Sequence, residues 1–419
     1  MPLKIDATTA DSLTLRIGDA ISKTAVFFGL DLVDFDWADE IAKTLPSGLT
    51  ENLVGICGEK GLGDFVYGQV LRRTQEAEDF GGDTSYLSEV KSFADPIALG
   101  REIVSELRAL PYSYRLTAVL PSIFSDDYYD DCQNFDLGRG LSIRSGAELE
   151  DHFPLSSDVE RRDKIIAHAS GGEKTLSLDP KALYLVQQKS GYVAGQQESP
   201  VSLEFKNTLR QFLGAALAVG AIKSGGWGAD KSIGVFVIHK QDDGYELISG
   251  ERFSPQIQDF YGKMHRPRTK DSKEPRSKVT ATVREQKLNA IKSVFAATDH
   301  GKRLSVASIW YLRSYLSHET LDGLLESTIA LEALLGGGNA EGTKLSSLLG
   351  NRCAYLIGKT LKDRDEILSQ FTEIYKLRSK IVHEGHHKFS SHERSLLVYS
   401  RELCRRAMIA EMRLLAHEK

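Results

Sequence analysis

The chain has 419 residues, a formal net charge of -5, 41% hydrophobic residues and 26% charged residues. These values exclude a single small domain and a wholly disordered chain, and they predict roughly two to three globular domains. We expect neither a membrane span nor a signal peptide, because the longest uninterrupted apolar stretch lies around Phe212 to Ile222 and the N-terminus meets acidic residues before any apolar core could build. Four cysteines lie far apart with no CxxC pair, which favours a reducing, cytoplasmic setting over a disulfide scaffold or a zinc knuckle.

The charge is distributed unevenly along the chain. Residues 1–261 hold 25 Lys and Arg against 40 Asp and Glu, whereas residues 262–419 hold 28 against 18. The sequence therefore predicts that a polyanionic partner, such as a nucleic acid, binds the C-terminal part. The alternative is that both charged regions serve solubility alone.

Residues 1–261 are predicted to form a mixed α/β region. Short apolar runs bounded by turn residues predict strands at residues 115–120, 137–143, 183–186 and 233–239. Apolar residues at helical spacing predict a helix at residues 203–222. The stretch that follows, residues 262–287, is rich in Lys, Arg, Ser, Thr and Pro and predicts a basic linker or loop.

After this linker only helical periodicity remains. Apolar spacing predicts helices at residues 287–297, 306–316, 321–335, 344–357 and 363–383, and a last helix after residue 390. Gly336 and Gly385 are the expected stops of two of them, and Ser390 with Glu393 forms a capping box that starts the last. The fold class is therefore an α+β N-terminal region followed by an all-α bundle of about five helices at residues 288–419.

Arg378 occupies an apolar row of the predicted helix at residues 363–383. The other members of the row, which recur every three or four residues, are Ile367, Phe371, Ile374 and Ile381. A guanidinium in such a position needs an anionic partner. That partner is either Glu332, on the predicted helix at residues 321–335, or a phosphate outside the chain.

His383 follows Arg378 by five residues and closes the same helix, where a cationic side chain is favoured. Together the two side chains can cleave RNA without a metal. His383 would act as general base or acid on a ribose 2′-hydroxyl or leaving oxygen, and Arg378 would stabilise charge on the phosphoryl group. A purely structural role for both residues is the alternative.

The spacing alone does not select this pair, since Arg313 and His318 form a second Arg-x4-His copy. We expect that copy to lie in a helix without an end at this point. The later copy is favoured by its context: a Tyr three residues before the Arg, an Ile-Val pair before the His, the helix-ending Glu-Gly, and two neighbouring lysines, Lys376 and Lys380.

Four ordered segments of the C-terminal part carry a family resemblance. They are TIALEALL at residues 328–335, then Glu341, NRCAYLIG at residues 351–358, and IYKLRSKIVHEG at residues 374–385. From about Ile309 to the C-terminus the chain resembles the Apea-like HEPN domains. The resemblance implies a helical bundle that often dimerises so that two Arg-x4-6-His motifs meet in one cleft. Active members are metal-independent endoribonucleases, many of them in anti-phage or toxin systems.

Carried over residue by residue, the resemblance makes Arg378 and His383 the catalytic pair and gives Glu332 a supporting position. Many catalytic motifs of the family have Asn, Asp or His after the Arg, whereas this chain has Ser379, which hydrogen-bonds without titrating. We assign Ser379, like Glu332, a supporting role in the active site. The expected RNA contacts are Lys376, Lys380, His386 and His387.

The sequence thus predicts a cytoplasmic endoribonuclease that dimerises through its HEPN-like domain, uses no metal or other cofactor, and acts in anti-phage defence or toxin-like growth arrest. The N-terminal region carries no catalytic constellation, so we expect it to sense a protein or small-molecule trigger or to restrain the nuclease. The alternative is a catalytically silent HEPN module that binds nucleic acid or a partner protein, with Arg378 paired to Glu332 for structure.

A second, more distant alternative lies in the same segment. Residues 383–387 read HEGHH and satisfy HExxH, the zinc-binding motif of metallopeptidases, in which two His bind the metal and a Glu acts as base. That motif needs a continuous helix, and Gly385 is more typical of a helix end. We therefore expect no metal at this position.

Overall fold

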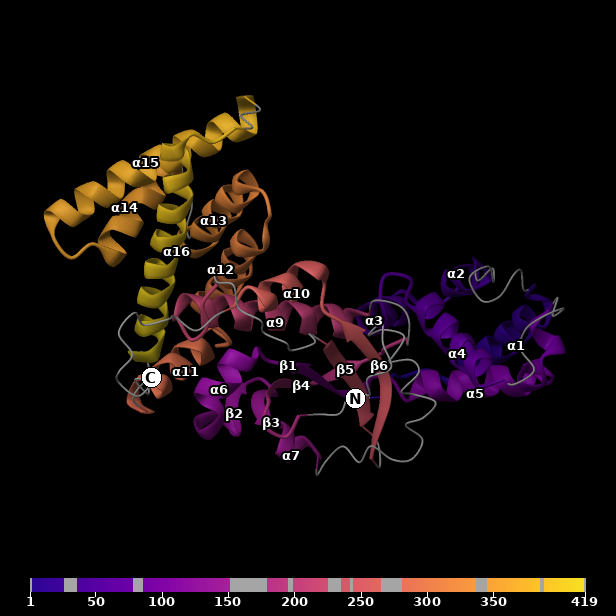
Figure 1. The fold of residues 1–419 in the computed structure, drawn as a ribbon. Helices are drawn as coiled ribbons and strands as arrows, with labels where there is room; N and C mark the ends of the chain where they lie inside the picture. Colours follow the sequence, from indigo (N-terminus) through magenta and orange to yellow (C-terminus); the bar gives the residue numbers. More distant parts are fainter. Residues whose placement is uncertain are drawn as a thin grey trace. The chain divides into compact units, whose positions relative to one another are not determined.

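The computed structural model describes residues 2–25, 36–77, 86–150, 179–194, 199–224, 235–241, 244–264, 281–336, 345–384 and 388–417. The described strands form one six-stranded antiparallel sheet in the order β2-β3-β4-β1-β5-β6 (Figure 1). Their bounds are β1 Tyr112–Val119, β2 Asn134–Gly138, β3 Leu141–Ser145, β4 Leu183–Gly191, β5 Val235–Gln241 and β6 Tyr245–Arg252. An α/β N-terminal region is therefore confirmed.

The chain divides into two compact units. The first unit comprises Met1–Leu116, Gln188–Phe205 and Val237–Gly250, and the second comprises Thr117–Gln187, Lys206–Phe236 and Glu251–Lys419. The candidate active site predicted from the sequence lies wholly in the second unit.

The first unit contains helices that were not predicted from the sequence. They are α1 (Ala7–Lys23), α2 (Asp36–Ala42), α3 (Ser47–Cys57), α4 (Leu62–Glu76) and α5 (Pro96–Arg108), with two 3-10 turns, η2 (Leu87–Glu89) and η3 (Lys91–Phe93). The side chains of Asp6 and Asp95 cap the N-termini of α1 and α5. At Gly100 on α5 a Cβ atom would lie 2.4 Å from the Thr14 carbonyl oxygen on α1, so the glycine permits the close packing of these two helices.

Three predicted strands, β1, β4 and β5, are confirmed, and the fourth prediction is wrong in form. Residues 137–143 do not make one strand but the turn of a hairpin, in which β2 and β3 pair Phe135 with Ile143. Arg139 adopts φ 56° between Gly138 and Gly140, which also have positive φ. An arginine in this left-handed conformation carries no signal in the apolar pattern, which is why one continuous strand was predicted. Strand β6 was not predicted.

The predicted helix at residues 203–222 is confirmed as α9 (Pro200–Ala218), although it ends earlier. Gly220, with φ 66°, follows its last turn. Three other described helices of this part, α6 (Ser122–Cys132), α7 (Gly146–Glu150) and α10 (Pro255–Gly262), were not predicted.

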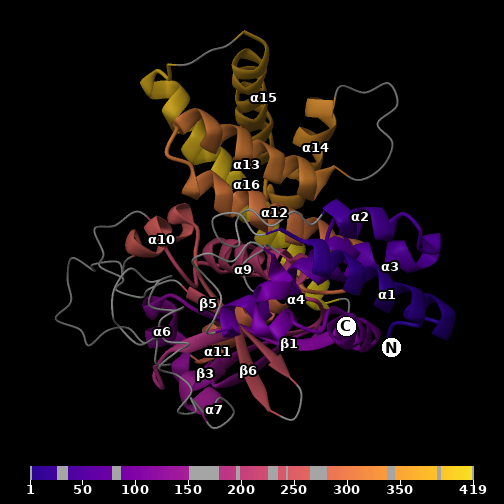
Figure 2. The ribbon, with the colours of Figure 1, turned by 90° about the vertical axis from the view of Figure 1, so that its right-hand side faces the viewer.

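The described C-terminal residues form six helices, α11 (Ala281–Ser293), α12 (Asp299–Leu316), α13 (Thr320–Leu335), α14 (Leu345–Ile357), α15 (Leu361–Glu384) and α16 (Ser391–His417). The helical character of this region is confirmed, and each of these helices overlaps one of the predicted helical stretches. Helix α11 begins within the predicted linker, of which residues 265–280 lie outside the described residues. The longest helix, α16, contacts each of the other five (Figure 2).

Several predicted helix ends are found where expected. The backbone N–H of Ser390 donates to Glu393 Oε2 at 2.8 Å, and the Glu393 N–H donates to Ser390 Oγ at 3.2 Å, so the capping box is confirmed. Gly336 caps α13. The expectation for the first Arg-x4-His copy is wrong, because α12 ends at Leu316 and His318 lies beyond it. Within the described ranges, no helix has the length and hydropathy that a membrane span requires.

Candidate active site on α13 and α15

Arg378 lies on the inward face of α15, as its place in the apolar row predicts. The four apolar members of that row, Ile367, Phe371, Ile374 and Ile381, are buried. Arg378 is 33% exposed in its side chain, so one part of the guanidinium contacts the bundle and another reaches solvent. Because the apolar residues of the same row are buried, they fix the direction in which the Arg378 side chain leaves the helix.

Glu332 on α13 is the anionic partner of Arg378. The guanidinium Nη2 lies 3.2 Å from Glu332 Oε1 and donates to Oε2 at 3.4 Å. Arg378 Nε is buried and makes no hydrogen bond with any part of the chain that the structure describes. The internal ion pair therefore exists, and it leaves donor capacity on the guanidinium unused.

Tyr375 is a third member of this cluster, and its role was not predicted from the sequence beyond its place in the motif. Its hydroxyl donates to Glu332 Oε1 at 3.1 Å, and its ring stacks on Phe371 with centroids 4.8 Å apart. The Arg378 guanidinium carbon lies 5.9 Å from the ring centroid. Burial, followed by the charge of Glu332 and the hydrogen bond to it, raises the pKa of Tyr375 well above its ordinary value. The hydroxyl therefore remains a donor at every physiological pH.

The structure does not bring His383 to Arg378 within one chain. His383 is exposed in the last turn of α15. Residues five apart on a helix point about 140° away from each other. The two side chains of one chain therefore diverge, and Arg378 contacts Glu332 rather than His383.

The residues expected to contact RNA lie on another face of α15. Lys376 and Lys380 project about 160° from Arg378 around the helix. With Ser379 they line an open pocket of about 390 Å³ between α15 and α16. The other ionisable side chains that line it are Glu373, Glu384, His392 and Glu393. The lysines thus lie among carboxylates, and Ser379 faces this pocket. His386 and His387 lie outside the described residues.

The first Arg-x4-His copy has a similar pairing. Arg313 Nε donates to Glu326 Oε1 on α13 at 3.2 Å, and the Arg313 guanidinium lies 4.3 Å from the centre of the Trp310 rings. His318 is exposed. Each copy therefore has an Arg held by a Glu of α13, and this pairing does not distinguish them. What distinguishes Arg378 is its position in a buried row with the additional Tyr375 contact.

The described residues contain no group of three or more His, Cys, Asp or Glu side chains placed to hold a metal ion. Of the HEGHH segment, His383 and Glu384 end α15, while residues 385–387 lie outside the described part of the chain, as does Glu341 of the HEPN-like segments.

No family model, curated protein or solved structure matches the chain. The likeness to HEPN domains is therefore carried by the sequence motifs.

Proposed function

We propose that the protein is a metal-independent endoribonuclease of the HEPN type that acts in the cytoplasm as a homodimer. Arg378 and His383 are its catalytic pair, and its setting is anti-phage defence or toxin-like growth arrest. The N-terminal region senses a trigger or restrains the nuclease. The observation that carries this proposal is the state of Arg378, which the bundle orients while one third of its side chain stays exposed.

The surroundings of Arg378 suit phosphate recognition. A guanidinium offers five N–H donors in a planar fork that matches two phosphate oxygens. Glu332 accepts from Nη2, and one third of the Arg378 side chain is exposed, so the guanidinium can still meet a phosphate from solvent. Glu332 and Tyr375 together orient the cation before a substrate arrives, which lowers the cost of organising the transition state.

His383 supplies the proton transfers. Its imidazole accepts the proton of a ribose 2′-hydroxyl, and the 2′-oxygen attacks the adjacent phosphorus while the 5′-oxygen leaves and takes up a proton. Arg378 stabilises the negative charge that builds on the phosphoryl oxygens. The products are a 2′,3′-cyclic phosphate and a 5′-hydroxyl end. No metal enters this sequence of steps.

A second copy of the chain completes the site. Because Arg378 and His383 of one α15 point about 140° apart, one phosphate is reached more readily by groups from two helices. Val382, one turn from Arg378 and next to His383, is 52% exposed, and an exposed valine at this position suits a protein partner. We infer that the α15 ends of two chains meet around the scissile phosphate.

The alternative is a catalytically silent HEPN module that binds nucleic acid or a partner protein. The pairing of Arg378 with Glu332 and Tyr375 favours it, since an ion pair within a bundle serves structure without any substrate. The separation of His383 from Arg378 within one chain is also consistent with this reading.

Cleavage of RNA in EDTA tests the proposal. The full chain is incubated with total tRNA and a structured message, and Arg378→Ala and Arg378→Lys are compared with Arg313→Ala. Both Arg378 variants should lose a factor on the order of 100 in rate, because Lys lacks the planar fork. Arg313→Ala is the control, because it removes the comparable ion pair with Glu326 in the first Arg-x4-His copy. This variant should retain activity, since that copy is not the proposed site. Binding of RNA without cleavage would support the silent module instead.

A further inference from the structure

The pocket between α15 and α16 lies on the same face of α15 as His383. Residues seven apart on a helix differ by about 20° in direction and lie about 10 Å apart along the axis, so Lys376 and His383 point the same way. Ser379 and Lys380 lie about 40° and 60° from His383. The pocket that these side chains line has a volume of about 390 Å³, within the range of about 300 to 1,000 Å³ typical of ligand sites. A group bound there therefore lies on the face of α15 that carries His383.

The pocket has an apolar floor and a polar rim. Leu377 on α15 and Leu396 on α16 line it, and each is 3% exposed. His392 lines the side formed by α16, and its Nε2 lies 3.1 Å from Glu373 Oε2, which positions the imidazole. Buried leucines beside an imidazole suit a flat, partly apolar ligand. Stacking on a histidine is one way in which proteins hold an unpaired RNA base.

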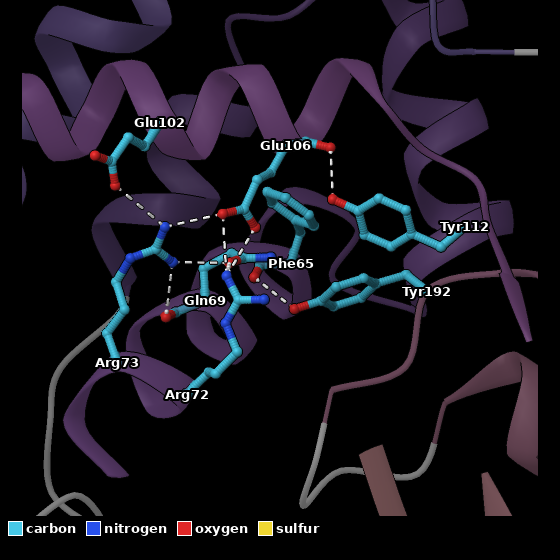
Figure 3. Close-up of polar contacts among 8 residues, drawn as sticks. All are labelled: Phe65, Gln69, Arg72, Arg73, Glu102, Glu106, Tyr112 and Tyr192. Atoms are coloured by element: carbon cyan, nitrogen blue, oxygen red, sulfur yellow. Dashed lines mark hydrogen bonds and ion pairs between the residues drawn. The ribbon is translucent and has the colours of Figure 1, made fainter. Parts of the chain in front are cut away.

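Charges of both signs are available at the rim. Lys376, Lys380 and Glu384 are exposed and make no hydrogen bond or ion pair with the residues that the structure describes. Glu384 differs in this from a structural carboxylate such as Glu106, which accepts a hydrogen bond from Arg73 Nη2 at 2.9 Å (Figure 3). Free donors and a free acceptor in one pocket match a ligand that carries both kinds of group, which a bare phosphate does not.

We propose that this pocket binds a guanine base of the RNA substrate and that Glu384 recognises it, an inference that rests on the proposed function. Among the four RNA bases, guanine alone presents two adjacent N–H donors on its Watson–Crick edge, at N1 and at the N2 amino group. The two oxygens of a carboxylate match such a pair of donors. Glu384 is thus the residue that gives the nuclease its base preference.

The order of the side chains around α15 orients the nucleotide. Glu384 lies about 20° from Leu377, whereas Lys376 lies about 20° from His383. The base therefore lies toward the leucines, and its 3′-phosphate lies toward the lysines and His383. His383 then takes the proton of the 2′-hydroxyl of the same nucleotide. RNA is cut on the 3′ side of guanosine, which leaves guanosine 2′,3′-cyclic phosphate ends.

Isothermal titration calorimetry on the full chain tests the pocket without any cleavage, with the 3′-monophosphates of guanosine, adenosine, cytidine and uridine as probes. We expect the guanosine compound to bind about tenfold more tightly than the other three, and Glu384→Gln to lose this preference. Glu384 is exposed, so the replacement leaves the fold intact. The matched control is Glu366→Gln, an exposed carboxylate of the same helix outside the pocket. Equal binding of the four compounds, or an unchanged preference in Glu384→Gln, would overturn the proposal.

Mapping of the cut sites separates this inference from the proposed function. The unaltered chain should leave cyclic phosphate mainly on guanosine, and Glu384→Gln should cut after the four nucleotides at more nearly equal rates. Cleavage without a base preference would overturn the guanine site and leave the ribonuclease standing. Selective binding of guanosine 3′-monophosphate without cleavage would support the guanine site and contradict the ribonuclease.

Discussion

At the scale of single residues, the candidate site depends on one carboxylate that two donors share. The sequence predicted Glu332 as one of two partners for Arg378, because an arginine in an apolar row needs a nearby anion, and the two side chains are in contact. The contact of Tyr375 with the same carboxylate was not predicted. Spacing places Tyr375 near Arg378 on α15, but the target of its hydroxyl depends on how α13 packs against α15.

We expect Tyr375→Phe to lower the free energy of unfolding by about 1 to 2 kcal/mol, because it removes a half-buried hydrogen bond to a charged acceptor. Urea denaturation followed by circular dichroism measures this change. Tyr355→Phe is the matched control, since Tyr355 is 71% exposed and should change stability by less than about 0.5 kcal/mol. Equal stability of both variants would show that the hydroxyl of Tyr375 contributes nothing to the cluster.

At the scale of elements, the apolar periodicity and the helix-ending residues of the sequence predicted the C-terminal helices well. The helices α13 and α14 begin and end within a residue of the prediction, because apolar spacing and Gly336 coincide. The hairpin of β2 and β3 was missed, since its turn depends on the backbone conformation of Arg139. The close crossing of α9 and α12 was equally invisible, because it depends on one glycine whose neighbour is distant in the sequence.

The close packing of α9 and α12 predicts that a larger residue at Gly214 destabilises the protein. A Cβ atom at Gly214 on α9 would lie 2.0 Å from the Ser308 carbonyl oxygen on α12, so Gly214→Ala must push the helices apart. We expect a loss of about 2 kcal/mol or more in the free energy of unfolding. Gly262→Ala, at the end of α10, meets no atom within 4 Å and should be neutral or slightly stabilising. A thermal melt of both variants that showed no difference would contradict this packing.

At the scale of the whole molecule, the cysteines belong to the interior. Cys57, Cys132, Cys353 and Cys404 are free thiols and all are buried. Burial raises the pKa of Cys57, Cys132 and Cys353 to about 12, and raises that of Cys404 further. The reactive thiolate is therefore scarce in the folded chain at neutral and mildly alkaline pH.

We expect a thiol-specific disulfide reagent at pH 8 to label none of the four cysteines in the native protein and all of them after denaturation. The same shift affects stability. Above the ordinary thiol pKa of 9.0 the unfolded chain loses protons that the folded chain retains, so stability should fall as the pH rises beyond about 9. Rapid labelling of a native cysteine would show that its helix opens more readily than its burial indicates.

The two parts of the chain differ in charge and in the candidate residues that they contain. Residues 1–261 are acidic, and the basic C-terminal part holds Arg378 and the exposed His383. The uneven charge is visible in the sequence alone, and it predicted that a polyanionic partner binds the C-terminal part.

The most direct measurement compares His383→Ala with His318→Ala in the EDTA cleavage assay. Both histidines are exposed, both end an Arg-x4-His copy, and neither replacement should change the circular dichroism melt. We expect that His383→Ala abolishes cleavage and leaves no cyclic phosphate ends, while His318→Ala cleaves as the unaltered chain does. Full activity in His383→Ala would contradict it.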